Sequence, residues 1–315
     1  MRLIKYIALL LSLILPLAAC AVAESGGEAR KLSIVVTDFP CYDFARQAAG
    51  ERASVKMLIA PGAEVHTYEP APADIVALKS ADLFIYIGGE SDAWADALLD
   101  ANEGGPRVLR LMDYVEAREE ELVEGMQADP ETAHTDEEEA EYDEHIWTSP
   151  VNAVRMLEAV RDALTELDPE NAQAYSADAD AYIAEVEALD AEFRAIVDGA
   201  ARRELVFGDR FPFLYFAREY GLDYYAAFPG CSSAAEPSAK TVAGLIDRVR
   251  TDGIPVVYII ELSSGQIART IAGETGAEVL TLHSCQTISL DDFEAGETYV
   301  SLMRRNAEAL KKGLN

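Results

Sequence analysis

Short apolar runs rich in β-branched residues alternate with helical stretches along most of this 315-residue chain. The first such unit is the run from Leu32 to Thr37, which is followed by a turn at Phe39-Pro40 and a helical stretch that ends at Ala49. Buried strands that alternate with helices are typical of a mainly parallel sheet with helices on its faces. The pattern therefore predicts an α/β fold, in which ligands bind at the carboxyl ends of the strands.

The same unit recurs on both sides of a central interruption. Further strands are expected over 54–59, 83–87, 108–111, 205–208, 224–228, 256–261 and 279–282. Helices are expected over 72–80, 92–101, 213–220, 241–251, 264–276 and 293–314. Because strand–helix alternation stops for about eighty residues in the middle of the chain, one large doubly wound domain is the less economical interpretation.

Two consecutive helical stretches follow this interruption. The first opens at Pro150 and ends at Leu167, and the second opens at Pro169 and ends before Gly199. The second is about thirty residues long, which at ~1.5 Å per residue matches the length of a small domain. We therefore predict two α/β lobes with mainly parallel sheets, joined by one long rigid helix. The predicted boundaries are 32–167 for the N-terminal lobe, 168–199 for the linking helix and 200–315 for the C-terminal lobe.

The first twenty residues have the layout of an export signal. Two basic residues precede an apolar stretch over 7–15 that leads to Leu17-Ala18-Ala19-Cys20. This ending resembles the bacterial lipobox, whose cysteine is lipidated and becomes the first residue of the mature protein, and ordinary cleavage near Ala23 is the alternative. The apolar core is shorter than the ~20 residues that a membrane-spanning helix needs. We predict a lipoprotein signal peptide over 1–20, a tether over 21–31, and an extracytoplasmic protein anchored to the cell membrane.

The chain is strongly acidic, with 26 Lys and Arg against 56 Asp and Glu and a formal net charge of −30. This excess argues against sequence-independent nucleic-acid binding, because phosphate contacts need a cationic face. It suits a protein that attracts cations. The stretch from Glu116 to Glu144 carries fourteen acids and one base, and its self-repulsion predicts a mobile surface loop within the N-terminal lobe. A role in recruiting metal and a role as a solubilising insertion both stay open.

Three cysteines remain after Cys20, at Cys41, Cys231 and Cys285. An odd number in an oxidising compartment allows one disulfide and one free thiol, and the sequence does not choose among the three pairings. Buried, unpaired thiols are the alternative for all three. A zinc site made of four thiolates is excluded, because only three thiols remain and no CxxC pair exists.

Three of the four histidines lie in places typical of ligands. His66 follows the second expected strand, His145 lies where the acidic stretch meets the next helix, and His283 follows the last expected strand. Loops after parallel strands share one edge of a sheet, so His66 and His283 can face a common crevice. One loop histidine alone indicates little, but three indicate a metal site, because neutral imidazole is a common metal ligand. His134, inside the acidic stretch, is expected to be solvated or a weak auxiliary ligand.

Short motifs are spread in order over nearly the whole mature chain. They are Pro61-Gly62 with His66, Tyr68, Glu69, Pro70 and Asp74; Asp82-Leu83-Phe84 before Gly88; His145-Ile146-Trp147 before Pro150; Tyr215-Phe216-Ala217 with Tyr220-Gly221-Leu222; Glu236-Pro237-Ser238; and Glu261 ahead of Thr275-Gly276. In this order they resemble the metal-binding solute-binding lipoproteins of bacterial zinc and manganese ABC transporters. The resemblance implies two lobes joined by a single long helix, with the metal held in the cleft between the lobes.

The resemblance also implies a ligand set. Its first two ligands correspond to His66 and His145. The third, a histidine or a glutamate, lies shortly before an aromatic pair, and matching that pair to Tyr215-Phe216 without gaps puts Arg210 at the position, with Asp209 beside it. Arginine offers no lone pair to a cation. Either Asp209 therefore takes the place or this ligand is lost, and pairing of Arg210 with Asp209 or Glu261 would count against ligation by Asp209.

The fourth ligand of the family is usually an aspartate, and His283 stands in its segment here. A nitrogen-rich site suits Zn²⁺, whereas Mn²⁺ prefers more oxygen ligands. The resemblance thus implies a monomeric, non-enzymatic protein that binds Zn²⁺ and delivers it to a membrane permease. One alternative is a manganese- or iron-binding transporter protein of the same fold. Another is a zinc-dependent hydrolase that uses His66 and Glu69 as an HxxE pair with a bound water, and a surface adhesin is a third class.

Overall fold

The computed structural model describes residues 30–100, 105–126, 142–231 and 237–315. Residues 32–315 form one compact unit, which contains two separate four-stranded sheets. The predicted signal peptide, the lipidation site Cys20 and nearly all of the predicted tether lie outside the described residues. None of the helices in the described part combines the length and the apolar character that crossing a bilayer requires.

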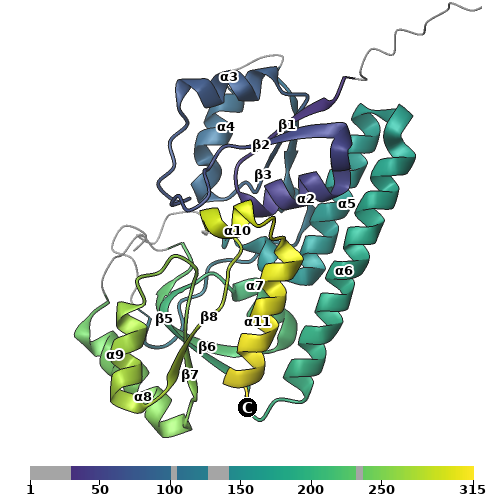
Figure 1. Ribbon diagram of the computed structural model, residues 1–315. Coiled ribbons are helices and arrows are strands. Elements are labelled where there is room, and N and C mark those ends of the chain that lie inside the picture. The colour runs from purple at the N-terminus through teal and green to yellow at the C-terminus, as the bar shows by residue number, and fades with distance from the viewer. Residues whose placement is uncertain (1–29, 101–104, 127–141, 232–236) are drawn as a thin grey trace, which may run out of the picture. The chain divides into compact units, whose positions relative to one another are not determined.

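The first sheet is entirely parallel, with the strand order β2-β1-β3-β4 (Figure 1). Its strands are β1 (Leu32–Val36), β2 (Ala53–Met57), β3 (Leu83–Tyr86) and β4 (Arg107–Arg110). The connecting helices are α2 (Phe39–Ala49), α3 (Pro72–Ser80) and α4 (Ala93–Asp100). Successive side chains of a strand point to opposite faces. Ile34 and Ile85 therefore pack in one core cluster with α2, while Val35 and Phe84 pack in another with α3 and α4.

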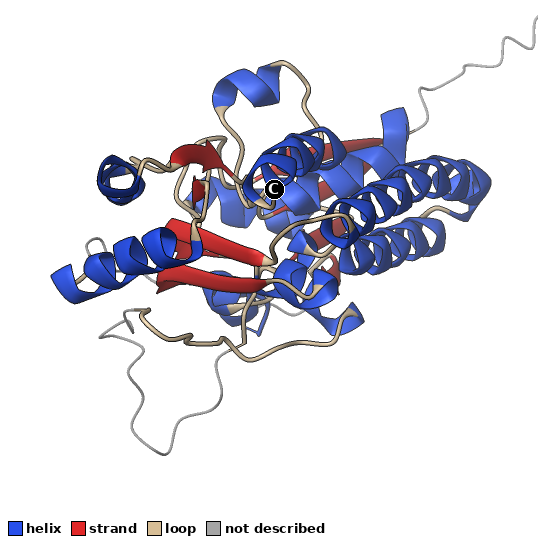
Figure 2. Ribbon diagram, turned by 90° about the horizontal axis from the view of Figure 1, so that it is seen from below, coloured by secondary structure: helices blue, strands red, loops and turns tan. Residues whose placement is uncertain are grey.

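The second sheet is also parallel, with the order β6-β5-β7-β8. Its strands are β5 (Glu204–Phe211), β6 (Asp223–Pro229), β7 (Val256–Ile259) and β8 (Glu278–Thr281). Its helices are α7 (Leu214–Tyr220), α8 (Ala239–Asp252) and α9 (Gln266–Thr275). Helix α9 approaches β5 closely, because Gly208 has no side chain and a Cβ there would lie 2.5 Å from the Cα of Ala268. Helices flank both sheets, as the view in Figure 2 shows.

A long helix connects the two sheets. Helix α5 (Pro150–Leu167) precedes α6 (Ala172–Asp198), which has 27 residues. Helix α6 packs on α2 and α5 beside the first sheet, and on α7 and α11 (Tyr299–Gly313) beside the second (Figure 1). Its buried residues recur at helical spacing, so one stripe faces the core. The predicted fold class, two parallel-sheet lobes flanked by helices with one long helix, is confirmed.

The expected terminal helix over 293–314 is wrong as a single element. The chain forms α10 (Leu290–Glu294) and then α11. Between them Gly296 has a φ of 77°, in the left-handed region that favours glycine. Thr298 then accepts a hydrogen bond from the backbone N–H of Ser301 and so caps a new helix.

The expectation of a mobile loop over 116–144 is wrong for its described flanks, while 127–141 lies outside the described residues. The backbone N–H of Arg118 donates to the hydroxyl of Tyr215 at 2.9 Å, and Glu121 pairs with Arg218. At the other end, Asp143 and Glu144 are only 1% and 3% exposed. Tyr215, as an acceptor, and Arg218, as a donor, thus hold the first flank against α7, which composition alone does not reveal.

The three cysteines of the described part are free thiols. Cys41 and Cys285 are fully buried, and Cys231 is half-buried. The possible disulfide is therefore not formed, and the alternative of unpaired thiols describes the structure.

A buried tryptophan links the two halves of the molecule. Trp147 is 1% exposed, and its Nε1 donates to the carbonyl oxygen of Ser284 at 2.7 Å. We expect Trp147→Phe to lower the free energy of unfolding by about 1–3 kcal/mol, because the buried carbonyl loses its partner. Trp94→Phe is the matched control, since the Nε1 of Trp94 has no hydrogen-bond partner among the described residues. Denaturant unfolding of both variants measures the difference, and equal losses would contradict the role of the Ser284 bond.

Candidate metal centre

His66 lies in the loop between β2 and α3, at the carboxyl edge of the first sheet. Contacts on both sides of His66 hold the loop in place. Val65 before it is buried, and the hydroxyl of Tyr68 after it donates to Asp74 at 3.0 Å. Asp74 also accepts from the N–H that precedes α3. The imidazole is mostly buried, and its Nδ1 lies 2.7 Å from the Oγ of Ser91, which follows β3. Residues that follow β2 and β3 therefore position this side chain together.

His145 precedes a short 3-10 helix (Ile146–Thr148) and is fully buried. Its backbone N–H donates to Asp143 Oδ1 at 2.7 Å, and its Nδ1 lies 3.1 Å from the same oxygen. The hydroxyl of Thr148 donates to the carbonyl of His145. Within the described residues, His145 Nε2 is buried and has no hydrogen-bond partner. A buried polar atom without a partner is costly, and a metal ion at this nitrogen removes the cost.

Glu144 joins these two histidines, although the sequence analysis treated it only as part of the acidic stretch. One ligand atom from each of His66, Glu144 and His145 lies within 4.8 Å of the others, and this is the group of metal-ligand type found in the described part of the chain. Glu144 accepts hydrogen bonds from the N–H and Oγ of Ser91, at 3.0 and 2.5 Å. Its position directly before His145 was the available signal, but burial of an acid within an acidic run has no sequence signature.

The hydrogen bonds fix which nitrogen of each imidazole carries the proton. A carboxylate only accepts, so the proton between His145 and Asp143 belongs to His145 Nδ1. Ser91 gives its single hydroxyl proton to Glu144, so its oxygen accepts the proton of His66 Nδ1. Both rings therefore present the lone pair of Nε2. A carboxylate behind the imidazole, directly or through a hydroxyl, is the arrangement typical of zinc-binding histidines.

The two histidines differ in acidity. Burial lowers the pKa of His66 below its ordinary value of 6.5, although the nearby Glu144 opposes the shift. Burial also acts to lower the pKa of His145, but Asp143, with Glu144 and Glu120, outweighs it and raises the pKa above 6.5. His145 therefore takes up a proton before His66 as the pH falls.

His283 and Asp209 are not members of the three-residue group. His283 follows β8, is 8% exposed, and accepts a hydrogen bond at Nδ1 from the N–H of Cys285 at 3.0 Å. Its Nδ1 lies 3.7 Å from an oxygen of Glu261. Asp209 lies on β5, and its Oδ2 is buried without a hydrogen-bond partner among the described residues. Nothing tests ligation by either side chain, so both assignments stay predictions.

Arg210 pairs with neither Asp209 nor Glu261 through its guanidinium. Its NH2 group donates to Glu64 Oε2 at 3.3 Å, and Glu64 lies two residues before His66. Only the backbone N–H of Arg210 contacts the side chain of Asp209, at 2.9 Å. A cavity of about 230 Å³ lies at the carboxyl ends of β5 and β7, and its lining includes Glu64, Asp209, Arg210 and Glu261. The position that holds a ligand in the family is therefore occupied by one half of an ion pair.

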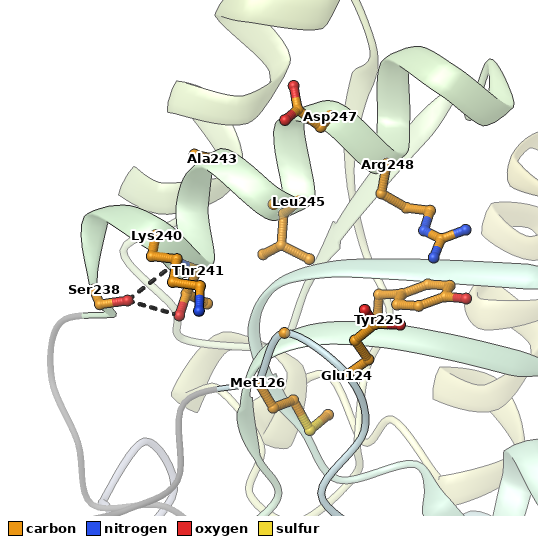
Figure 3. A pocket seen from close by; sticks show the side chains of 12 residues that line it. Glu124, Met126, Tyr225, Ser238, Lys240, Thr241, Ala243, Leu245, Asp247 and Arg248 are labelled. Atoms are coloured by element: carbon orange, nitrogen blue, oxygen red, sulfur yellow. Dashed lines mark hydrogen bonds between the residues drawn. The ribbon is translucent and has the colours of Figure 1, made fainter.

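Two other features add no ligand to this three-residue group. Glu69, the second residue of the HxxE pair, is exposed and is not a member of the three-residue group. A larger cavity of about 820 Å³ lies between α8 and residues 124–126, and its described lining contains neither histidine nor cysteine (Figure 3). Its lining mixes acids with Lys240 and Arg248, and the Arg248 guanidinium lies 4.1 Å from the ring centroid of Tyr225. The candidate centre is therefore at His66, Glu144 and His145.

Comparison with known sequences finds one family and several relatives. The family described as zinc-uptake complex component A, periplasmic, matches residues 34–313. The zinc-binding lipoprotein AdcA of Streptococcus pneumoniae is 32% identical over 311 residues, which cover 98% of this chain and 61% of AdcA. The high-affinity zinc uptake system protein ZnuA of Bacillus subtilis is 30% identical over 305 residues, covering 94% of this chain and 93% of ZnuA. The chain thus spans less than two thirds of AdcA and most of ZnuA.

Solved structures share the fold. The Zn(II)-bound ZnuA-like domain of Streptococcus pneumoniae AdcA has a TM-score of 0.75 and 30% identity, covering 90% of this chain and 99% of that domain. The metal-dependent lipoprotein YcdH of Bacillus subtilis has a TM-score of 0.76 and 28% identity, covering 90% of this chain and all of that chain.

Proposed function

The chain belongs to the family of zinc-uptake complex component A, as its motifs predicted, and from this premise we propose that it binds Zn²⁺ outside the cytoplasm and delivers it to an ABC-type permease. The observation that carries the proposal is the buried Nε2 of His145, which has no hydrogen-bond partner in the described residues and lies in a group with His66 and Glu144. In this proposal the metal is cargo, so the site needs tight binding and release rather than chemistry on a substrate.

The donor set favours zinc over manganese or iron. Two imidazole nitrogens and a carboxylate fit the four-coordinate sites of Zn²⁺, whereas Mn²⁺ prefers more oxygen ligands. The relatives named for zinc support the same choice. Competition titrations of the purified protein test it: we expect one tightly bound Zn²⁺ per chain and weak binding of Mn²⁺. Stronger binding of Mn²⁺ than of Zn²⁺ would favour the manganese transporter alternative.

The relatives are zinc-binding transport proteins, and we propose that this chain likewise has no catalytic activity. The hydrolase alternative needs Glu69 beside a zinc-bound water, and the exposed Glu69 does not belong to the group that contains His66. The zinc-loaded protein is therefore expected to show no peptidase or amidase turnover. Turnover that Glu69→Gln abolishes would overturn this part of the proposal.

Membrane attachment through Cys20 and a monomeric state belong to the same proposal. The relative AdcA is named a lipoprotein, which supports lipidation of the cysteine in Leu17-Ala18-Ala19-Cys20. Cys20→Ala is expected to release the protein from the membrane fraction of cells. Sedimentation of the mature protein gives its oligomeric state.

The acidic stretch is proposed to raise the rate of metal capture without adding to the equilibrium affinity. Seven acids lie within 127–141, outside the described residues, whereas the flank at Glu121 is engaged with α7. Replacing only 127–141 with a neutral Gly/Ser linker therefore leaves the described contacts in place. We expect a nearly unchanged zinc affinity and slower capture at low salt, because long-range attraction is screened beyond ~10 Å at 0.1 M salt and beyond ~3 Å at 1 M. Equal capture rates at low salt would identify the stretch as a solubilising insertion.

A further inference from the structure

Arg210 cannot bind a metal ion, so this chain needs another side chain as the third ligand. We propose that Glu144 is the third protein ligand of the Zn²⁺ ion, so that residues of the N-terminal half alone, His66, Glu144 and His145, hold the metal. This inference rests on the proposed function, and it differs from the ligand set predicted by resemblance, which placed the remaining ligands at Asp209 and His283.

The distances suit a single metal ion. One atom of each side chain, a ring nitrogen for the histidines and a carboxylate oxygen for Glu144, lies within 4.8 Å of the other two. Two ligands of a tetrahedral zinc ion, each ~2.0–2.1 Å from the metal, lie roughly 3.4 Å apart. Shifts of about an ångström in the side chains therefore bring all three atoms to one metal ion.

The carboxylate of Glu144 is held in one orientation and is shielded from solvent. Glu144 is 3% exposed and is held by both the N–H and the hydroxyl of Ser91. Gly89 makes room for it, because a Cβ at this position would lie 2.3 Å from the Cβ of Glu144. In the described part of the chain, neither lysine nor arginine pairs with Glu144, whose ion-pair partner there is His66. A buried carboxylate without a cationic partner is costly, and a divalent cation supplies the missing charge.

Two further buried acids lie at the same carboxyl edge of the first sheet. Asp38 follows β1 and Asp92 follows β3, and each is 4% exposed. Asp38 accepts a hydrogen bond from the backbone N–H of Cys41, and Asp92 accepts from those of Ile87 and Gly88. Backbone donors therefore satisfy these two acids, whereas an oxygen of Glu144 lies 3.5 Å from His66 Nδ1.

On the second sheet, Arg210 forms an ion pair at the position where the resemblance predicted a metal ligand. Its guanidinium donates to Glu64, in the loop that carries His66, at 3.3 Å. The C-terminal half thus contacts this loop through an ion pair rather than through a ligand to the metal. Glu144 brings a negative charge to the site, and this charge also offsets the positive charge that Arg210 brings near it.

Zinc affinities of matched variants test the proposal. Wild-type protein, Glu144→Gln, Asp209→Asn and His283→Gln are titrated with Zn²⁺ in competition with a chromophoric chelator near neutral pH. We expect Glu144→Gln to weaken binding by roughly 1,000-fold, beyond the 10–100-fold range for partners that only orient a ligand. Asp209→Asn and His283→Gln are expected to bind close to the wild-type affinity. Near wild-type binding by Glu144→Gln, or losses of similar size in either of the other two, would overturn the assignment.

Cobalt spectra separate a ligand from a positioning residue. Co²⁺ in the site has d–d absorption bands that change with the number and kind of its ligands. Glu144→Gln is expected to alter these bands, whereas Ser91→Ala is expected to weaken binding and leave them unchanged. Glu144→Asp keeps the charge and serves if the glutamine variant does not fold, with altered bands expected again. Unaltered bands in the Glu144 variants would make Glu144 a positioning residue. If His145→Ala also binds normally, the proposed site itself fails, which is a different outcome.

Discussion

His145→Ala is expected to lower the zinc affinity about 1,000-fold or more, which corresponds to about 4 kcal/mol of binding free energy. The variant removes the imidazole whose Nε2 is buried without a hydrogen-bond partner among the described residues. It also removes the hydrogen bond between His145 Nδ1 and Asp143, so this carboxylate no longer orients a metal ligand. Competition titration with a chelator of known zinc affinity measures the loss.

Two variants control for other effects of this substitution. His145→Gln fills more of the fully buried space than alanine and shows whether an altered core, rather than a lost ligand, causes the change. His134→Ala removes a histidine from the acidic stretch, outside the described residues, and is expected to bind zinc like the wild type. The local backbone keeps its support, because Ser149 caps α5 in all of these variants. An unchanged affinity in a folded His145→Ala protein would remove His145 from the site.

The fold was predictable because it depends on patterns that are local in sequence. The β-branched run at Leu32 and the buried run at Leu83 each form a strand of the first sheet, within a residue or two of the expected bounds. Pro150 opens α5, and Pro169 opens a short 3-10 helix (Pro169–Asn171) directly before α6, both at positions where a missing N–H costs nothing. The break at Gly296 was not anticipated, because a glycine within an apolar helical pattern is compatible with continuation of the helix.

The site was predictable only in part, and the reason is that burial and pairing across the two sheets are tertiary properties. His66 and His145 follow from motifs and lie together, with ring centroids 5.9 Å apart. Glu144 belongs to a run of acids whose other described members range from exposed to buried, and its burial depends on Ser91, 53 residues away. The partner of Arg210 lies 146 residues away at Glu64, so no local pattern connects them. The assignments of Asp209 and His283 stay predictions that the variants above can decide.

As the pH is lowered, the zinc affinity is expected to fall in two stages. Zinc requires neutral imidazoles, so each proton that a ligand histidine binds competes with the metal. The pKa of His145 lies above 6.5, because Asp143 and neighbouring carboxylates outweigh its burial, so this histidine begins to lose its metal-binding form first. The pKa of His66 lies below 6.5, because burial disfavours its charged form. The affinity therefore falls about tenfold per pH unit between the two pKa values and about a hundredfold per unit below both.

Asp143→Asn tests this order, because it removes the charge that raises the pKa of His145 while leaving a side chain of similar size. The first stage is expected to move to lower pH in the variant, with burial now the dominant influence on His145. The affinity above both pKa values is expected to fall by about 10–100-fold, since the amide orients the imidazole less well than the carboxylate. Chelator competition across the acidic and neutral range measures both effects on the two proteins. An onset at the same pH in wild type and variant would contradict the assignment of the first stage to His145, and a single-stage decline would contradict the separation of the two histidines.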